Sequence, residues 1–461
     1  MINCSPLRIG SGKTDGITDM LILKDKDGRA FIPATSLAGV LRSQIADIYS
    51  DTVADKLFGS IEDDYKQTDA AQSMINISDV VLDAGISKLI QRDGVKIDEI
   101  TGVGKTGAKY DFEALDRGAK GSLSIEITVR QNDINKEPQL VLAHVYSKDA
   151  YDELAAIIAD MLTSGISVGS LTTKGYGEIR SIHPAKCYVF DFNDEKGSDE
   201  WLCYLNGSLP AENYAGDDKK QYFAPDDFCM NIGFSLYNSL IVRDYDSNNF
   251  TKQNIDDNIA AIQMTSGNDY IIPGTSIKGA VKNKAFDILM ALSDNDEKKV
   301  NATLDEMMGF ANDSEDRSQG MRSSLYVKDA YISKDKVHTM KQTRNRIDRF
   351  TGGTIDNALF ADEPIWQNDR DKISVYMDLR LRYASEAQAG LMLLILRELW
   401  LGNLAVGGGK SIGRGVLKGK KCTIHYKNKS FIIDQADKFT VEGDKAVLES
   451  YVKKLAGEFN G

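Results

Sequence analysis

Two stretches of this chain decide its fold: FIPATSLAG at residues 31–39 and IIPGTSIKG at residues 271–279. Five of the nine positions are identical, and Pro33 and Pro273 lie 240 positions apart. Each stretch has the pattern of a strand end, a proline turn and a helix start. Because solenoid repeats recur every 20 to 50 residues or so, this much longer spacing predicts a duplicated domain.

Four more blocks repeat in the same order. They are residues 57–59 with 307–309, 77–80 with 327–330, 97–102 with 347–352, and the glycine-rich 168–179 with 406–417. Their offsets stay between 238 and 250 positions. Five repeated blocks in one order predict a tandem duplication of a whole domain.

The repeats predict four regions along the chain. The two copies would occupy residues 1–190 and 228–426, and a C-terminal extension would follow over residues 427–461. Residues 191–227 between the copies are acidic and rich in turn-forming residues. That composition is typical of a linker or an edge insertion.

Within each copy the elements follow one order. Helices are expected over 36–49 and 149–164, and again over 276–293 and 385–401; strands are expected over 74–82 and 121–129, and again over 324–332 and 372–381. With a leading and a closing strand this is a β-α-β-β-α-β order. The predicted class is therefore α+β, with two tandem ferredoxin-like or RRM-like domains that carry long insertions.

The composition excludes several classes of protein. The 461 residues include 56 Lys and Arg against 68 Asp and Glu, a formal net charge of −12, so bulk positive charge cannot drive nucleic-acid binding. The five cysteines are widely spaced without a C-x-x-C pair, which supports neither a disulfide framework nor a zinc ribbon. No apolar run is long enough to cross a membrane, and a cytoplasmic location is expected.

Local positive charge nevertheless gathers at three places. A helix start attracts anions, and we expect Gly274 and Ser276 with Lys278 and Lys282 to form a phosphate site; a plain helix cap is the alternative. The glycine-rich blocks bring backbone amides close to a ligand, and residues 410–421 hold five basic and no acidic residues. Residues 334–349 hold six basic residues against two acids.

At these repeated residues the sequence resembles the RAMP (repeat-associated mysterious protein) superfamily, in particular the backbone subunits of type III CRISPR effector complexes. The features that carry the resemblance are SPLRIGSG, IPGTSIKG, the I-D-R-x-T-G block and the glycine-rich segment before the last strand. Two such domains in one chain look like the fused backbone subunits of type III-D-like systems. Ala34 and Ala38 depart from Gly274 and Lys278, so the first helix start should bind phosphate more weakly.

The resemblance implies RNA as the ligand and a ribonucleoprotein complex of antiviral defence as the setting. A CRISPR guide RNA, a complementary target RNA and other type III effector subunits would be the partners, and a hairpin thumb in each domain would reach over the RNA. The expected RNA-binding residues are Ser36, Arg42, Gly169, Lys174, Gly175, Gly274, Ser276, Lys278, Lys282, Arg344, Arg346, Arg349, Gly407, Gly408, Gly409, Lys410 and Arg414.

Family members that cut target RNA carry an aspartate after the first glycine loop. Asp19 is the matching residue here, with Asp15 as a rival; Asp257, or Asp256, is its counterpart in the second copy. Asp19 and Asp257 would hold Mg²⁺ or Mn²⁺ near the scissile phosphate. The expected function is metal-dependent endoribonucleolytic cleavage of the paired target RNA; the alternatives are a non-catalytic RNA-binding scaffold and a guide-processing RNase.

Overall fold

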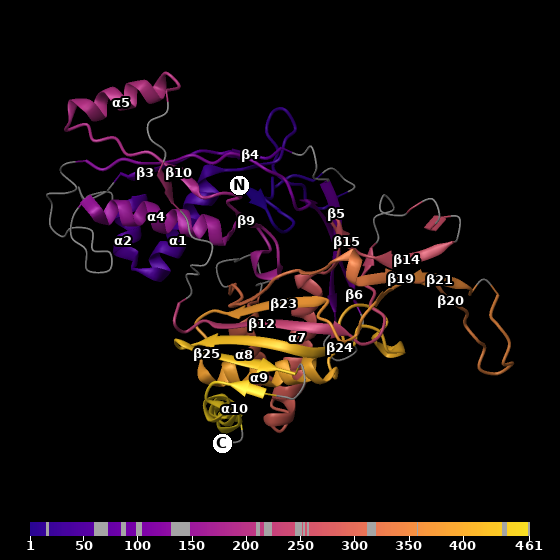
Figure 1. The fold of residues 1–461 in the computed structure, drawn as a ribbon. Helices are drawn as coiled ribbons and strands as arrows, with labels where there is room; N and C mark the ends of the chain where they lie inside the picture. Colours follow the sequence, from indigo (N-terminus) through magenta and orange to yellow (C-terminus); the bar gives the residue numbers. More distant parts are fainter. Residues whose placement is uncertain are drawn as a thin grey trace.

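The computed structural model describes residues 1–14, 18–59, 72–83, 89–97, 104–130, 148–208, 213–215, 224–244, 251, 254–255, 258–310, 320–356, 358–435 and 440–459. Its largest hydrophobic cores are separate. One contains residues between Leu7 and Ile179, and the other contains residues between Phe228 and Phe459. In Figure 1 the first half lies above and the second half below. The boundaries proposed from the repeats stay predictions, but each half has a core of its own.

The second half is built on one large β-sheet against which helices pack. The central strands stand in the order β17 (Leu325–Val327), β23 (Val375–Leu381), β12 (Phe228–Leu236) and β24 (Leu417–Tyr426), and all neighbours are antiparallel. This is the strand order of a ferredoxin-like β-α-β-β-α-β unit. The α+β class predicted from the sequence is confirmed.

The C-terminal residues extend that unit. Strands β25 (Lys429–Asp434) and β26 (Thr440–Glu442) widen the sheet beside β24. Helix α10 (Lys445–Phe459) packs along α9 (Glu386–Leu401), which is buried on most sides because it lies between other elements of the core. Helices α7 (Gly274–Leu292) and α8 (Glu297–Met308) pack against each other in the same core.

The first half repeats the order with shorter strands. Its helices are α1 (Ala34–Ile48), α2 (Asp51–Phe58) and α4 (Lys148–Ser164). Its short strands pair as β1 (Ile2–Asn3) with β9 (Glu178–Arg180), β9 with β8 (Ile166–Ser167), β3 (Ile75–Ile77) with β7 (Ile125–Ile127), and β2 (Phe31–Ile32) with β4 (Val80–Val81). The expected helices are present, and α1 and α7 begin two residues earlier than predicted.

Three predicted strands are wrong in length, and of residues 121–129 only Ile125–Ile127 form a strand, β7. Residues 74–82 form β3 and β4, and residues 324–332 form β17 and β18 (Ala330–Ile332), each pair in two different sheets. The break falls at Asp79 and at Asp329, whose carboxylates accept hydrogen bonds from the first amides of α1 and α7 at 2.7 Å. The chain leaves one sheet there because the aspartate turns toward the helix start.

A long hairpin joins the two halves. Strands β5 (Leu89–Ile97) and β6 (Gly104–Leu115) run from the first half toward the second (Figure 1), and the Arg92 guanidinium donates to the Thr265 carbonyl at 3.0 Å. Beside it the second half carries β13 (Arg243–Asp244), β14 (Ile259–Gln263), β20 (Gln342–Arg344) and β21 (Phe360–Glu363) in one sheet, and β19 (Val337–Thr339) pairs with β22 (Ile365–Gln367).

The segment expected to be a linker is partly ordered. Helix α5 (Glu195–Leu205) starts after Asp194, whose side chain accepts from the Lys196 amide, and β10 (Ala185–Cys187) pairs with β11 (Asn213–Ala215). Figure 1 shows α5 at the outer edge of the first half. Among the described residues no helix is both long and apolar enough to cross a bilayer.

The contact between α9 and α10 gives a test of the second core. A Cβ added to Gly390 of α9 would lie 2.3 Å from the Tyr451 carbonyl oxygen of α10. We expect Gly390→Ala to lower the free energy of unfolding by about 1–3 kcal/mol, because the two helices must separate. Gly39→Ala is the matched control: Gly39 lies in α1 with open space around it, and this change should stabilise by about 0.5–1 kcal/mol. Equal effects of the two changes in chemical denaturation would contradict this packing.

Candidate nucleic-acid interface

A close backbone contact holds the two halves together. The glycine-rich loop at residues 169–177, which we call the inner loop, includes the 3-10 turn η1 (Thr172–Lys174) and ends against the start of α7. A Cβ on Gly274 would lie 2.6 Å from the Lys174 carbonyl oxygen, and a Cβ on Gly175 would lie 2.6 Å from Asp329 Oδ1. Only glycine allows this approach at both positions.

Lys278 completes the contact from inside α7. It is 7% exposed, and its Nζ donates to Ser323 Oγ at 2.6 Å, to the Leu325 carbonyl at 2.7 Å and to the Thr173 carbonyl at 3.3 Å. Burial, with a smaller effect from the Lys174 charge, lowers the pKa of Lys278 to about 7. The Asp329 carboxylate, which accepts from the first amide of α7, is also buried, and burial raises its pKa to about 7.

This arrangement corrects one expectation. The predicted phosphate site at the start of α7 is filled by the protein itself, because Asp329 accepts from the Gly274 amide and the Lys278 ammonium is bonded to three protein oxygens. The alternative, a plain cap by a serine side chain, is not found either: Pro273 is the N-cap residue, and its side chain makes no hydrogen bond to the helix. Gly175, Gly274 and Lys278 therefore lie in the junction between the halves.

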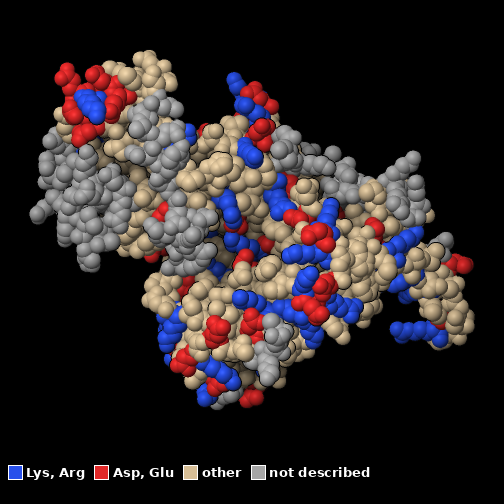
Figure 2. Space-filling view, in the orientation of Figure 1, with Lys and Arg blue, Asp and Glu red and all other residues tan. Residues whose placement is uncertain are grey.

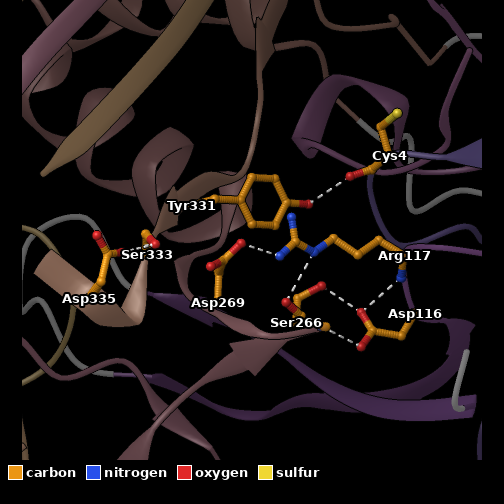
Figure 3. Close-up of polar contacts among 9 residues, drawn as sticks. Cys4, Asp116, Arg117, Ser266, Asp269, Tyr331, Ser333 and Asp335 are labelled. Carbon is orange, nitrogen blue, oxygen red and sulfur yellow. Dashed lines mark hydrogen bonds and ion pairs between the residues drawn. The ribbon is translucent and has the colours of Figure 1, made fainter. Parts of the chain in front are cut away.

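A second polar cluster fixes the same junction (Figure 3). It joins the residues that follow β6 to β15 (Thr265–Ser266) and β16 (Asp269–Ile272). The Asp116 carboxylate accepts from the Gly267 amide at 2.8 Å, while the Arg117 Nε donates to the Ser266 carbonyl at 3.0 Å and its guanidinium pairs with Asp269. The guanidinium also lies 4.2 Å from the centre of the Tyr331 ring, whose hydroxyl donates to the Cys4 carbonyl at 3.3 Å (Figure 3).

These contacts enclose a groove of about 1140 Å³ between the hairpin, the inner loop and the second half. Of the described residues that line it, seven are basic and two are acidic. The basic ones are Arg92, Lys109, Lys174, Arg243, Lys278, Lys282 and Lys410; the acidic ones are Asp93 and Asp244. Figure 2 shows many Lys and Arg, with some Asp and Glu among them, where the two halves meet, while Asp and Glu predominate over α5.

Aromatic rings lie in the same wall. Tyr110, Phe112 and Tyr176 line the groove, with ring centres 6.0 Å apart for the first two and 5.7 Å apart for the last two. Phe112 and Tyr176 are buried, so Tyr110 is the ring of this cluster that a base could reach, and cations beside an accessible ring are typical of surfaces that bind single-stranded nucleic acid. No pattern in the sequence identified these rings, because the hairpin and the inner loop are distant in the chain.

The groove collects many of the predicted RNA-binding residues. Among them, the side chains or backbone of Lys174, Ser276, Lys278, Lys282, Gly407, Gly408, Gly409 and Lys410 line it. Burial lowers the pKa of both Lys174 and Lys410, and within the described residues neither makes an ion pair. Two segments that the sequence places far apart therefore present ammonium groups to one cavity.

Arg414 and Arg344 have a different environment. Arg414 is 3% exposed, and it donates to Asp362 at 2.8 Å and to Gln342 at 2.5 Å. Arg344 pairs with the same Asp362 carboxylate. Both arginines thus hold β20, β21 and the second glycine loop together. Because each is paired with the Asp362 carboxylate, neither presents a free guanidinium to the groove. The basic pattern was visible in the sequence, but its buried acidic partner was not.

The remaining predicted RNA-binding residues lie elsewhere. Arg42 of α1 bonds the Gly59 carbonyl at 2.9 Å and pairs with Asp55, so it joins α1 to α2. Ser36 lies in the first turn of α1, and Gly169 lies against the Arg8 carbonyl. Arg346 and Arg349 are exposed in the loop after β20. In that loop Asp348 accepts from the Phe350 and Thr351 amides, so the I-D-x-x-T-G block is a turn motif in this copy.

The first catalytic candidate lies beside the hairpin. The Asp19 amide donates to Asp111 Oδ1 at 2.9 Å, and the Asp111 amide donates to Asp19 Oδ2 at 3.0 Å. Asp111 also accepts from Gln91 Nε2 at 2.6 Å, and Gln91 lines the groove. Asp111 is a second carboxylate that the sequence did not single out. Asp15, Asp256 and Asp257 lie outside the described residues.

These two carboxylates are too few to form a metal site from protein ligands alone. Within the described residues no group of three or more histidine, cysteine, aspartate or glutamate side chains could hold a metal ion. Mg²⁺, however, often binds through one or two carboxylates and takes its other ligands from water and substrate phosphates. Asp19 and Asp111 fit that kind of site. Asp25 does not, because one of its carboxylate oxygens pairs with the Arg29 guanidinium while the other accepts from the Asp27 and Arg29 amides.

Comparison with known proteins places the chain in a family. The model of the RAMP superfamily matches residues 3–180 and 253–418, which is most of the chain. The protein belongs to the RAMP superfamily. The two segments matched in this RAMP protein correspond to the two halves with separate cores, and the family resemblance inferred from the repeated blocks is confirmed.

More specific relatives are distant. A solved structure similar to this RAMP protein is the cryo-EM structure of the type III-B Cmr-beta complex bound to cognate target RNA, with 12% identity and a TM-score of 0.30. The match covers 44% of this chain and 62% of the other. A search of curated proteins finds no match.

Buried Lys278 predicts a pH dependence. Its pKa falls from the ordinary 10.5 to about 7 in the folded chain, so between these values the unfolded chain holds more protons and stability rises with pH. Compared with Lys278→Met, the wild type should gain up to about 1.4 kcal/mol of unfolding free energy per pH unit above pH 7. Chemical denaturation of both proteins at pH 7 and pH 9 measures the difference. Parallel pH profiles would contradict the buried placement of this ammonium.

Proposed function

We propose that this RAMP protein binds RNA in the groove between its halves, as a backbone subunit of a type III CRISPR effector. The observation that carries the proposal is the groove itself: its described lining holds seven basic residues, of which Lys278 and Arg92 bond protein carbonyls, the partly exposed ring of Tyr110, and only two acids. The repeated blocks, which resemble the backbone subunits of such effectors, agree with it. Two fused ferredoxin-like domains of the type III-D-like kind are part of the proposal.

The lining of the groove suits binding without sequence readout. Lys174, Lys282 and Lys410 offer ammonium groups to backbone phosphates, which position an RNA but carry no sequence information. Tyr110 is partly exposed and offers a ring face on which any base stacks, while Phe112 and Tyr176 are buried and support it from within. Sequence specificity would then come from pairing between a guide RNA and its target, as in other RNA-guided systems.

Cleavage of the target RNA is the catalytic part of the proposal. Asp19 and Asp111 lie next to Gln91 and Tyr110, which line the groove, so a strand bound there would pass close to both carboxylates. Together they would hold Mg²⁺ or Mn²⁺, which would neutralise charge on the scissile phosphate. Asp257, or Asp256, is proposed for a second site. The competing function is a non-catalytic scaffold that only holds the RNA and its neighbours.

RNA binding is tested by its salt dependence. In Lys174→Ala/Lys282→Ala/Lys410→Ala, the slope of log K against log salt for single-stranded RNA should fall by about 2, because each phosphate contact contributes about 0.7. Fluorescence anisotropy of a labelled RNA at several salt concentrations gives the slope. Lys429→Ala/Lys445→Ala/Lys453→Ala, which removes three lysines of β25 and α10, is the control with the same change in charge. A slope that falls equally in both variants would contradict binding in the groove.

Catalysis is tested separately. In the assembled complex with Mg²⁺ and a labelled target RNA, Asp19→Asn and Asp111→Asn should each remove the same product band, and Asp257→Asn should remove another. Asp27→Asn, at an exposed turn position, should leave every band. Full cleavage by the Asp19 and Asp111 variants would favour the scaffold, while cleavage of a free repeat transcript without target would favour a guide-processing RNase.

A further inference from the structure

The second glycine loop, residues 407–415, which we call the outer loop, has the conformation of the inner loop. Both contain a 3-10 turn, η1 in the inner loop and η5 (Lys410–Ile412) in the outer. Positive φ angles recur at matching positions: Leu171 and Gly409 at 61° and 70°, Gly175 and Gly413 at 93° and 82°. The amides of Val168 and Val406 close the two loops onto Gly177 and Gly415 at 2.9 and 3.0 Å.

The inner loop docks on α7 through groups that the outer loop also has. We call Gly274, Lys278 and Asp329 the α7 docking site. The inner loop contacts this site through the carbonyls of Thr173 and Lys174 and the Cα of Gly175. Backbone carbonyls and a glycine stand at the same places in the outer loop. Docking therefore depends on the loop conformation more than on its side chains.

The outer loop meets no such site within the described residues. A Cβ on Gly413 would have Asn238 Nδ2 at 3.8 Å as its only close neighbour, whereas one on Gly175 would lie 2.6 Å from Asp329. Ile412, which stands where the inner loop has Lys174, is 54% exposed. The outer loop thus presents the conformation of a docked loop on an open surface.

The first half carries the counterpart of the α7 docking site. The Ala34 amide donates to Asp79 Oδ1 at 2.7 Å, as the Gly274 amide does to Asp329, and the N-cap Pro33 has the backbone angles of Pro273. The Ser73 hydroxyl donates to the Leu57 and Ile75 carbonyls and accepts from the Ile75 amide. The Ser323 hydroxyl makes the same bonds with Met307 and Leu325. Asp79 is exposed, while Asp329 is buried under the inner loop.

Two residues of the first half prevent a loop with the conformation of the inner loop from docking at this counterpart site. Ala34 places a Cβ where, at position 274, it would lie 2.6 Å from the docked carbonyl of Lys174. Ala38 stands in place of Lys278 and cannot donate to a carbonyl such as that of Thr173. A head-to-tail contact between identical chains would need both features at this site. The second junction contact is missing as well, since Arg29 and Val81 stand in place of Asp269 and Tyr331.

We propose that the exposed tip of the outer loop at Ile412 and Gly413, beyond the residues that line the groove, is a docking surface for a different protein, and that Ala34 and Ala38 keep a second copy of this chain from taking that place. The partner presents a proline-capped helix with glycine at its first position and lysine at its fifth, and an aspartate that binds the first helix amide. The inner loop on α7 shows the geometry of the contact. This inference does not rest on RNA binding or on cleavage.

The test installs the docking site where the chain lacks it. In an Arg29→Asp/Val81→Tyr background, which restores the second junction contact, Ala34→Gly/Ala38→Lys should associate head to tail: its weight-average mass in sedimentation velocity should at least double with rising concentration, while the background variant and the wild type stay monomeric. Adding Gly413→Asn should return the variant to a monomer, because asparagine tolerates positive φ but fills the space that the docking aspartate needs. A monomeric fourfold variant, or a wild type that associates through the outer loop, would overturn the proposal.

The reciprocal exchange tests the same residues inside the chain. Gly274→Ala/Lys278→Ala places the first-half residues in the α7 docking site, and amide hydrogen exchange at Thr172–Tyr176 should become at least tenfold faster as the inner loop is released. Exchange in β12 is the internal reference for intact folding. Unchanged protection of the inner loop would show that these two positions do not decide docking, and would overturn the proposal even if the first variant fails to fold.

Discussion

The close approach between the inner loop and the first turn of α7 is the constraint on which the functional surface depends. Gly175 and Gly274 let two backbones meet at distances that any side chain would prevent, and Lys278 and Asp329 bind the exposed backbone groups from within. The groove has one wall on each half, so its width follows from this contact and from the polar cluster around Arg117. A chain that lost the contact would keep both cores and lose the surface between them.

The repeated blocks predicted more of the fold than composition or periodicity did. They gave the duplication, the element order and the family, because the helix starts and glycine loops need particular residues to make their turns. They did not reveal that two of the predicted strands break at an aspartate, Asp79 or Asp329, whose carboxylate bonds the first amide of the helix. In the sequence, an aspartate that follows a strand looks like any turn residue. The repeated blocks also could not separate Lys174 and Lys410, which line the groove, from Arg414, whose charge is paired with a carboxylate fifty-two positions earlier.

The acidic total charge and the basic groove are compatible. Asp and Glu gather on surfaces such as α5, while the groove concentrates cations, so the local field differs in sign from the net charge (Figure 2). Such a distribution favours RNA that enters the groove over RNA that meets the outer surface. The repeated helix-start motif also has two different roles. In the second half it forms the α7 docking site for the inner loop. In the first half the same motif carries Ala34 and Ala38, so its surface differs from that docking site.

The central claim is that RNA lies between the two halves and touches both walls. Photo-crosslinking of a 4-thiouridine-labelled single-stranded RNA to the full chain, followed by mass spectrometry of the crosslinked peptides, tests it most directly. The account predicts crosslinks in peptides that contain Tyr110 or Phe112 of β6 and also in peptides that contain Gly407–Ser411. Crosslinks confined to one half, or found mainly on the exposed loop around Arg346 and Arg349, would contradict it.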